Sequence, residues 1–209
     1  ISIFLVLFFF RGNLNFYPKN QYLKYLSYVW LGQNAILAIS VAMRNFWYIN
    51  YFNLAYKRIG VAIFLTMTVY GILSVICKVR NKKSAFYLFK TNALAVFLIL
   101  VISSFVNWDA YIVRYNFEHA KTAFVHLDYL STLSDKTLPE LDKSIEELRR
   151  IDTIQKENFP FDETFMTPET YKEKIAQRKA AFMAKWEHKG VLSWNWAEYK
   201  AYRAILEHD

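Results

Sequence analysis

The chain has 209 residues, a net charge of +8 and 55% hydrophobic residues, values that taken alone describe a basic globular domain. The charges are unevenly distributed, because residues 1–107 contain 11 Lys and Arg but no Asp or Glu, and all 18 acidic residues follow, starting with Asp109. The basic residues stand singly between long apolar runs, which argues against nucleic-acid binding. An unpaired carboxylate is costly in hydrocarbon, whereas Lys and Arg at segment ends reach the headgroups, so we expect the first half to be a transmembrane domain, residues 1–107.

Four apolar segments are predicted to form membrane helices. Each of the last three contains 18 or 19 consecutive uncharged residues, close to the ~20 that a spanning helix needs. Soluble core helices can also be apolar all round, but three of this length without one acid would be unusual. The first segment is too short to span, so we expect three complete helices and one truncated helix. Their approximate ranges are 1–10, 25–43, 59–77 and 91–108.

The chain begins with Ile1 rather than Met, and we interpret it as the C-terminal portion of a longer protein. No basic region precedes the first apolar run and no small-residue cleavage site follows it, so this run does not resemble a signal peptide. Cys77 is the only cysteine, so no disulfide can form within the chain.

The stretch RNFWYINYFNLAYKR, residues 44–58, is too polar and aromatic to span. Its Tyr, Trp and Asn residues predict a short helix lying in the membrane interface, where aromatic rings sit at headgroup depth. Trp108 and Tyr111 indicate a similar interface where the fourth segment ends.

Basic residues in the short loops predict the orientation. The loops after the first and third segments hold eight Lys and Arg, whereas the loop between the second and third segments holds three. The positive-inside rule therefore places the loops after the first and third segments in the cytoplasm. The chain after Trp108 is then expected on the opposite side, which in a Gram-negative cell is the periplasm.

From Asp109 onward the sequence predicts amphipathic helices. Apolar residues from Val113 to Leu127 recur at spacings of three and four, which indicates one helix. The segment LSTLSD breaks it, and TLPE then offers Thr137 as the N-cap of a second helix with its own apolar stripe. These elements predict an αα-hairpin over residues 108–151.

Residues 152–209 are expected to form a C-terminal helical tail. Residues 152–167 have no clear period and are interpreted as a surface connection. Thr167 and Pro168 predict the start of a helix that ends near Gly190, and a last helix is expected to begin near Ser193 or Asn195. The expected fold class is all-α, with integral membrane helices followed by an all-helical extramembrane tail.

The linear order of the chain resembles a group of bacterial polytopic membrane proteins, the related domain-of-unknown-function families 4153 and 4173. The resemblance rests on YFNLAYKRIGV, the basic loop after the third segment, NALAVFLILVISSFVNWDAYIVRYNFEHA, DYLSTLSDKTLPEL and SWNWAEYKAYRAI, and it covers about residues 48–141 and the last helix. In this group the membrane exit carries N-x-D, then an arginine and Y-N, which here correspond to Asn107, Asp109, Arg114, Tyr115 and Asn116. Relatives often have glycine and threonine in the turn at YFNLAYKR, where this chain departs. The resemblance implies a many-pass inner-membrane protein and no activity.

The sequence contains no pattern typical of an enzyme active site. HExxH, GxSxG, Walker and GxGxxG patterns are absent, and no cysteine–histidine pair is indicated. His119 and His126, with Glu118 and Asp128, suggest a metal site, but seven residues of straight helix rise ~10.5 Å, too far for two imidazoles to share a zinc ion. We therefore predict no catalytic residue, no metal and no cofactor.

Gln33 and Asn34 are adjacent polar residues within the second segment, where an unpaired amide is costly. They could line a substrate path, or they could hydrogen-bond to a neighbouring helix, which is the commoner use of such residues.

The residues around Asp109 are the main candidates for a specific role. Asp109 and Arg114 are five residues apart and diverge around a helix, so Asp109 is expected to meet a basic residue of the outer loop instead. Such a contact would be either a structural link or part of a headgroup or ligand site. The candidates are Asn107, Asp109, Arg114, Tyr115, Asn116, Arg44, Lys57 and Arg58.

The leading hypothesis is a non-enzymatic scaffold or accessory subunit of a complex in the bacterial inner membrane, with the tail as its docking element. Its expected partners are membrane lipids and other membrane-protein subunits or a second copy of the chain. The alternative is a transporter or lipid-handling protein whose substrate site lies mainly in missing N-terminal segments, and an intramembrane enzyme is third.

Overall fold

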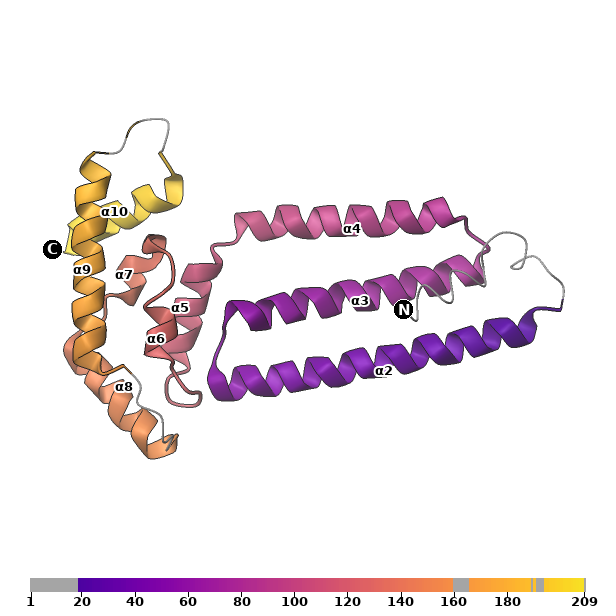
Figure 1. Cartoon of the computed structure of the whole chain (residues 1–209), viewed down its shortest axis with the longest axis horizontal. Coiled ribbons are helices and arrows are strands. Elements are labelled where there is room, and N and C mark those ends of the chain that lie inside the picture. Colours follow the sequence, from indigo (N-terminus) through magenta and orange to yellow (C-terminus); the bar gives the residue numbers. More distant parts are fainter. Residues whose placement is uncertain (1–18, 160–165, 189, 191–193, 209) are drawn as a thin grey trace. The chain divides into compact units, whose positions relative to one another are not determined.

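The computed structural model describes residues 19–159, 166–188, 190 and 194–208. Within these ranges every regular element is a helix, which confirms the all-α prediction (Figure 1). The predicted first segment, residues 1–10, lies outside the described residues. The elements are α2 (Gln21–Phe52), α3 (Tyr56–Arg80), α4 (Ala85–Phe105), α5 (Trp108–Glu118), α6 (Leu127–Leu130), the 3-10 turn η2 (Asp135–Thr137), α7 (Leu138–Leu141), α8 (Ile145–Asn158), α9 (Pro168–Glu187) and α10 (Trp196–His208).

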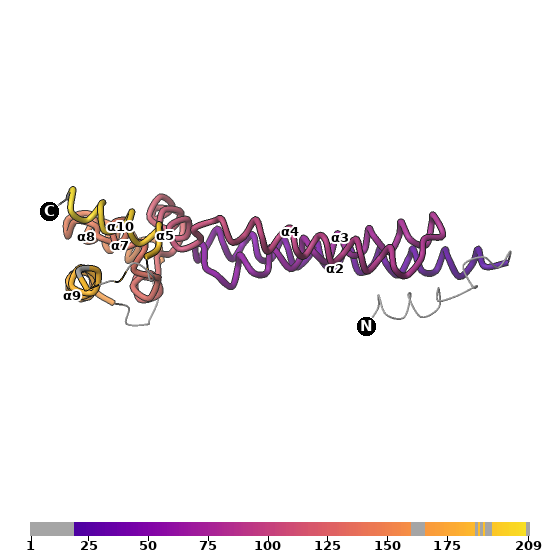
Figure 2. Tube along the Cα trace, turned by 90° about the horizontal axis from the view of Figure 1, so that it is seen from above, coloured from indigo at the N-terminus to yellow at the C-terminus, as the bar shows by residue number. Residues whose placement is uncertain are grey.

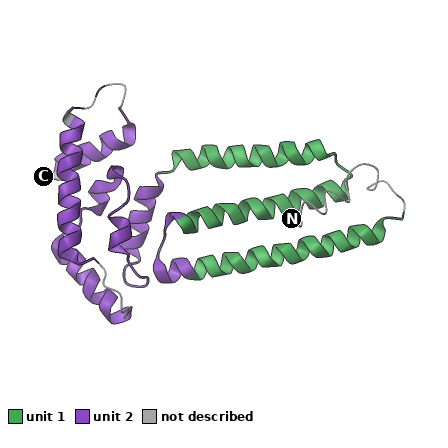
Figure 3. Ribbon diagram, viewed as in Figure 1, with its two compact units in different colours: residues 1–47, 57–106 green, residues 48–56, 107–209 purple. Residues whose placement is uncertain are grey.

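The chain divides into two compact units (Figure 3). Unit 1 comprises residues 1–47 and 57–106, and unit 2 comprises residues 48–56 and 107–209. Unit 2 thus contains the loop between α2 and α3 as well as everything after α4.

The helices α2, α3 and α4 are each long and apolar enough to cross a membrane. They have 32, 25 and 21 residues. At a rise of ~1.5 Å per residue the shortest is about 32 Å long, which matches the ~30 Å of bilayer hydrocarbon. The prediction of three complete spanning helices is therefore confirmed.

In unit 1 these helices lie side by side, with α3 in the middle (Figures 1 and 2). Leu31 of α2 is fully buried against one face of α3, and Ala35 packs against the same cluster. On the other side, the Asn92 side chain of α4 donates a hydrogen bond to the Ser74 hydroxyl of α3 at 3.0 Å. The α3 side of the cluster consists of Ile72, Val75 and Val79.

The prediction of a separate short helix within residues 44–58 is wrong, because α2 continues without a break to Phe52. Residues 44–52 contain neither glycine nor proline, so nothing in the backbone stops the helix there. The helix ends at Asn53, whose φ of 61° lies in the left-handed region that asparagine tolerates better than most residues.

Unit 2 is built around the short helix α7, which contacts α5, α9 and α10. Its amphipathic helices bury apolar faces against one another, as expected for a small helical domain. The largest fully buried side chains of this core are Ile112, Leu130, Leu138, Leu141, Leu148, Tyr171 and Ile175.

The predicted αα-hairpin of residues 108–151 has a different local structure. The first helix, α5, ends at Glu118 rather than continuing to Leu127, and the chain turns at residues 119–126 before the single-turn α6. Thr137 makes no side-chain cap, and the longer second helix, α8, begins after Ser144, whose hydroxyl accepts a hydrogen bond from the Glu147 N–H at 3.1 Å. The apolar residues have the expected spacing, but the turn of residues 119–126 interrupts the helix. This turn is held by tertiary contacts described below.

The C-terminal helices begin close to where the sequence indicates. The Thr167 hydroxyl accepts a hydrogen bond from the Thr170 N–H at 3.3 Å and caps α9, with Pro168 in the first turn. The predicted connection over residues 152–167 is shorter than expected, because α8 extends to Asn158, and residues 160–165 lie outside the described ranges.

Candidate functional site

The helix α5 carries four of the candidate residues, and a fifth, Asn107, directly precedes it. Two residues separate it from α4, and the Asn107 side chain caps it by accepting a hydrogen bond from the Ala110 N–H at 3.3 Å. This helix presents its candidates to two different surroundings within unit 2. Asp109 and Asn116 contact the segment of residues 48–56, which includes the loop between α2 and α3, whereas Arg114 points toward α7.

Asn116 links α5 to this loop. Its side-chain oxygen accepts a hydrogen bond from the Leu54 N–H at 2.8 Å, and its Nδ2 donates to the Leu54 carbonyl at 3.0 Å. Both residues are buried. The amide therefore substitutes for a peptide partner and satisfies both main-chain groups of Leu54, which have no helical partner.

Asn53 makes the reciprocal connection. Its Nδ2 lies 3.2 Å from the Phe124 carbonyl and 3.4 Å from the carbonyls of Asn116 and Ala123. The Phe124 N–H in turn donates to the Tyr51 carbonyl at 2.8 Å. These hydrogen bonds join the segment of residues 48–56 to the turn that follows α5.

Gln155 of α8 holds the same turn from the other side. Its side-chain oxygen accepts from the Val125 N–H at 2.9 Å, and its Nε2 donates to the carbonyls of Ala120 and Ala123. Ala120, Ala123, Phe124 and Val125 of this turn are buried although they lie outside any helix, so their main-chain groups need such partners. This requirement explains why the chain leaves the helical path predicted for residues 113–127.

Asp109 lies near the start of α5 and accepts a hydrogen bond from the Tyr56 hydroxyl. The Tyr56 N–H donates to the Tyr129 hydroxyl at 3.0 Å. The predicted partners of Asp109, namely Arg44, Lys57 and Arg58, belong to unit 1, and their pairing with Asp109 stays a prediction.

Tyr115 and His119 stack face to face, with ring centroids 4.0 Å apart. Burial raises the pKa of the Tyr115 hydroxyl, and the neighbouring Tyr111 adds to this rise. His126 caps α6 by accepting a hydrogen bond from the Tyr129 N–H at 3.4 Å. In the described part of the chain, no group of three or more His, Cys, Asp or Glu side chains is placed to hold a metal ion.

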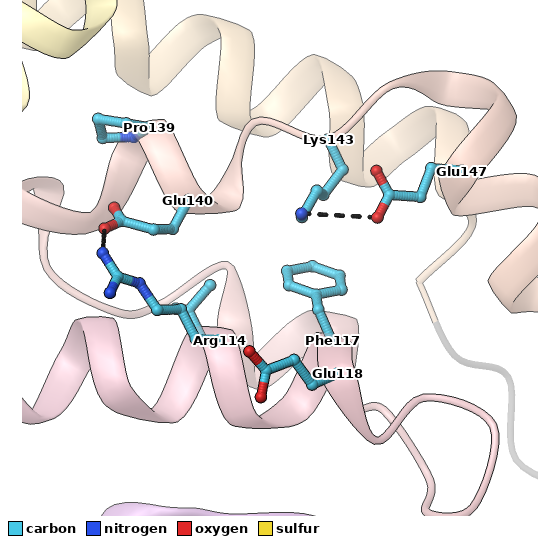
Figure 4. A pocket seen from close by; sticks show the side chains of 8 residues that line it. Arg114, Phe117, Glu118, Pro139, Glu140, Lys143 and Glu147 are labelled. Carbon is cyan, nitrogen blue, oxygen red and sulfur yellow. Dashed lines mark hydrogen bonds and ion pairs between the residues drawn. The ribbon is translucent and has the colours of Figure 1, made fainter.

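Arg114 borders an open groove of about 490 Å³ between α5 and the α7–α8 segment (Figure 4). Its guanidinium pairs with the Glu140 carboxylate at 2.9 Å, and Lys143 pairs with Glu147 at 3.5 Å. The groove therefore has charges of both signs on its walls. Its lining residues are Val113, Arg114, Phe117, Glu118, Pro139, Glu140, Lys143 and Glu147.

The two polar candidates of α2 differ in their surroundings. Asn34 donates to the Trp30 carbonyl one turn earlier, at 2.8 Å, and so satisfies part of its amide within its own helix. Gln33 is exposed, and its amide makes no hydrogen bond to the residues that the structure describes. A membrane around α2 would leave this amide to be satisfied by another helix or by a polar path.

Sequence reasoning missed Asn53, Gln155 and Asn92. Asn53 is the residue at which the α2 helix ends, and an asparagine that follows an unbroken helical pattern is a usable signal for a left-handed position. Asn92 is a polar residue inside a spanning segment and could have been listed with Gln33 and Asn34. Gln155 has no such signal, because a glutamine on an amphipathic helix ordinarily faces water.

The two parts of the site differ in what they can do chemically. The amides of Asn53, Asn116 and Gln155 are occupied by main-chain groups and therefore hold the domain together. The groove beside Arg114 is open, and its charged side chains lie at its surface, so it is the part available to a ligand.

A comparison with protein families matches the domain of unknown function DUF4153 over residues 1–144. The match includes α2 to α7, and therefore Asn53, Asn116 and the α5 wall of the groove. Neither the curated proteins nor the solved structures contain a match to the chain. Because the matched region is more than half of the sequence, the chain belongs to the DUF4153 family, as the order of its segments indicated.

Proposed function

We propose that this protein is a non-enzymatic scaffold or accessory subunit of a membrane complex, with unit 2 as its docking element. The observation that carries the proposal is the way the chain connects the two units. It passes between them three times, after Trp47, after Tyr56 and after Val106. An ordinary C-terminal tail would have a single connection to its membrane domain.

The side-chain amides of Asn53 and Asn116 strengthen these connections. Asn53 and Asn116 hold the segment of residues 48–56 inside unit 2, and this segment comprises the end of α2, the loop and the first residue of α3. A partner that binds unit 2 is thereby tied to the ends of all three spanning helices. This arrangement suits a subunit that positions another protein at a membrane.

The membrane helices offer a second contact surface. None of the residues in α4 is buried within the described chain, although residues 93–102 of the helix are all apolar. Membrane lipids and the spanning helices of other subunits or of a second copy are its expected neighbours. The loop charges favour an orientation with unit 2 outside the cytoplasm, which for the bacterial inner membrane is the periplasm.

The proposal is tested by native mass measurement of the protein extracted from its own membranes in mild detergent. We expect a complex of fixed stoichiometry that contains a second protein or a second copy. Asn116→Leu should dissociate it, whereas Asn158→Leu, which changes an exposed asparagine of the same unit, should not. A monodisperse monomer in the unaltered protein would overturn the proposal.

One observation favours the alternative of a transporter or lipid-handling protein. Gln33 exposes its amide nine residues after Lys24 and eleven before Arg44, which is ~14 and ~17 Å along the helix and so near the middle of the span. If Gln33 hydrogen-bonds to a neighbouring subunit, Gln33→Leu should weaken the complex in the same mass measurement. A complex of unchanged strength would favour a polar path along α2.

A further inference from the structure

The groove between α5 and the α7–α8 segment lies wholly within unit 2 (Figure 4). Val113, which is fully buried, Phe117 and Pro139 give it an apolar lining, and five charged side chains surround that lining. With about 490 Å³, it has room for a small polar group such as a lipid headgroup.

The charges of the groove are arranged as two weak ion pairs and one open carboxylate. Arg114 and Glu140 are 63% and 25% exposed, and Lys143 and Glu147 are 31% and 46% exposed. Exposed pairs of this kind are worth at most about 1 kcal/mol, so a ligand can displace them at little cost. Glu118 makes no ion pair within the described residues, and its carboxylate points into the groove beside Phe117 (Figure 4).

Arg114 and Glu118 are four residues apart on α5, so they project from the same face of the helix with their Cβ atoms ~6 Å apart. This pair presents one positive and one negative group to the same ligand. A ligand whose anionic and cationic groups are separated by a short linker matches both at once. In phosphoethanolamine, two carbon atoms separate the phosphate from the primary ammonium group.

The ring of Phe117 supports a cationic group at this end of the groove. The Lys143 ammonium already lies over this ring, 5.2 Å from its centroid. An aromatic face stabilises a cation at this distance through its quadrupole, and a ligand ammonium placed between Phe117 and Glu118 would gain the same attraction.

The chain connection to α4 indicates where such a ligand comes from. α4 ends at Phe105 and α5 begins at Trp108, so only Val106 and Asn107 separate the groove-bearing helix from a spanning helix. Arg114 is ~9 Å from Trp108 along α5. Arg114 thus follows the last residue of a membrane span by only nine positions in the chain, and lipid headgroups are the abundant zwitterions at a membrane surface.

We propose that this groove binds the phosphoethanolamine headgroup of a membrane lipid, with the phosphate at Arg114 and the primary ammonium at Glu118. The three N–H donors of that ammonium can hydrogen-bond to the carboxylate, whereas the quaternary ammonium of a phosphocholine lipid has none. The site is independent of the docking role proposed for unit 2.

The test measures lipid binding to the full chain in mild detergent by native mass spectrometry. We expect one phosphatidylethanolamine per chain, held at least ~10-fold more tightly than phosphatidylcholine or phosphatidylglycerol. Glu118→Gln and Arg114→Gln should each reduce this preference ~10-fold, because each removes one charged contact. Glu146→Gln and Arg150→Gln are matched controls on exposed positions of α8 outside the groove, and both should bind like the unaltered protein.

A competition with soluble phosphoethanolamine separates the two sources of the headgroup. If the lipid is the ligand, the soluble compound should compete only weakly, because it lacks the acyl chains. Displacement of the lipid at equal concentrations would overturn the assignment to a lipid. Equal retention of the three lipids, or phosphatidylethanolamine binding unchanged in both groove variants, would overturn the site itself. Thermal unfolding of each variant verifies that Glu118→Gln, at an exposed and unpaired position, leaves the domain folded.

Discussion

The side chain of Asn116 and the main chain of Leu54 are joined by two hydrogen bonds, of 2.8 and 3.0 Å, although 62 residues separate them in sequence. The Asn116 side chain thereby satisfies both main-chain groups of Leu54, which lies between α2 and α3 and outside any helix. The link fixes α5, which continues from α4, against the loop that connects α2 to α3.

Asn116→Leu is expected to destabilise unit 2 by about 2–4 kcal/mol, because it leaves the buried N–H and carbonyl of Leu54 without a partner. Thermal unfolding of the protein in detergent measures the loss, and proteolysis should cut first at the turn of residues 119–126. The control is Asn158→Leu, since the Asn158 side chain is exposed and its contact with the Lys121 carbonyl is long, at 3.5 Å. If the two variants unfold alike, the double hydrogen bond contributes little.

Asn53 combines a left-handed backbone with side-chain hydrogen bonds, and two substitutions separate these contributions. Asn53→Gly removes only the side-chain contacts, whereas Asn53→Ala also forces a Cβ-bearing residue without local compensation to keep a φ of 61°. We expect the alanine variant to be less stable than the glycine variant by about 1 kcal/mol, as measured by the same thermal unfolding. Equal stabilities would mean that the backbone relaxes away from the left-handed region.

The spanning helices could be predicted because their signal is local. Long uncharged runs that end at charged residues identify the apolar parts of α3 and α4, since burial in hydrocarbon depends on each residue's own side chain. The end of α2 could not be predicted from the same signal. Aromatic and polar residues at 44–52 suggest an interface, but they carry no helix breaker, and the helix runs on until Asn53.

The turn after α5 shows what local patterns miss. The apolar spacing from Val113 to Leu127 is helical, yet the helix ends at Glu118, because Asn53 and Gln155 supply hydrogen bonds to a non-helical main chain. Gln155 lies 30 residues beyond Val125, and neither residue has a property from which their contact could be predicted. For the candidate site, the sequence singled out the right helix, α5, but it could not show that Asn116 faces a loop while Arg114 faces a groove.

The stability of unit 2 is expected to fall in acid because of Asp142. Burial alone would raise the pKa of this carboxyl group, but hydrogen bonds and charges from Lys172 and Lys179 outweigh it and hold the pKa below its usual range. A depressed carboxyl pKa contributes stability above the unfolded-state pKa of about 4, and this contribution is lost as the pH falls through the lower folded-state pKa. The loss therefore occurs below about pH 4.

Unfolding midpoints recorded between pH 7 and pH 3 test this link between α9 and the segment after α7. Asp142→Asn should lower the midpoint at pH 7 and flatten its dependence on pH below 4. The control is Asp152→Asn, which removes an exposed pair with Lys156 on one helix, worth only ~0.3–0.5 kcal/mol. A pH profile that Asp142→Asn leaves unchanged would assign the acid sensitivity to other groups.

Orientation in the membrane is open to a direct measurement, because Cys77 is the only cysteine and Cys77→Ser provides a background without thiols. Single cysteines are then introduced as Lys121→Cys in unit 2 and Lys83→Cys in the basic loop between α3 and α4, both at exposed positions. In intact cells with a permeable outer membrane, a maleimide that cannot cross the inner membrane should label the first variant only. Permeabilising the inner membrane should allow both to react. Labelling of Lys83→Cys alone in intact cells would reverse the orientation, and it would mean that the eight basic residues in the first and third loops do not determine the topology of this chain.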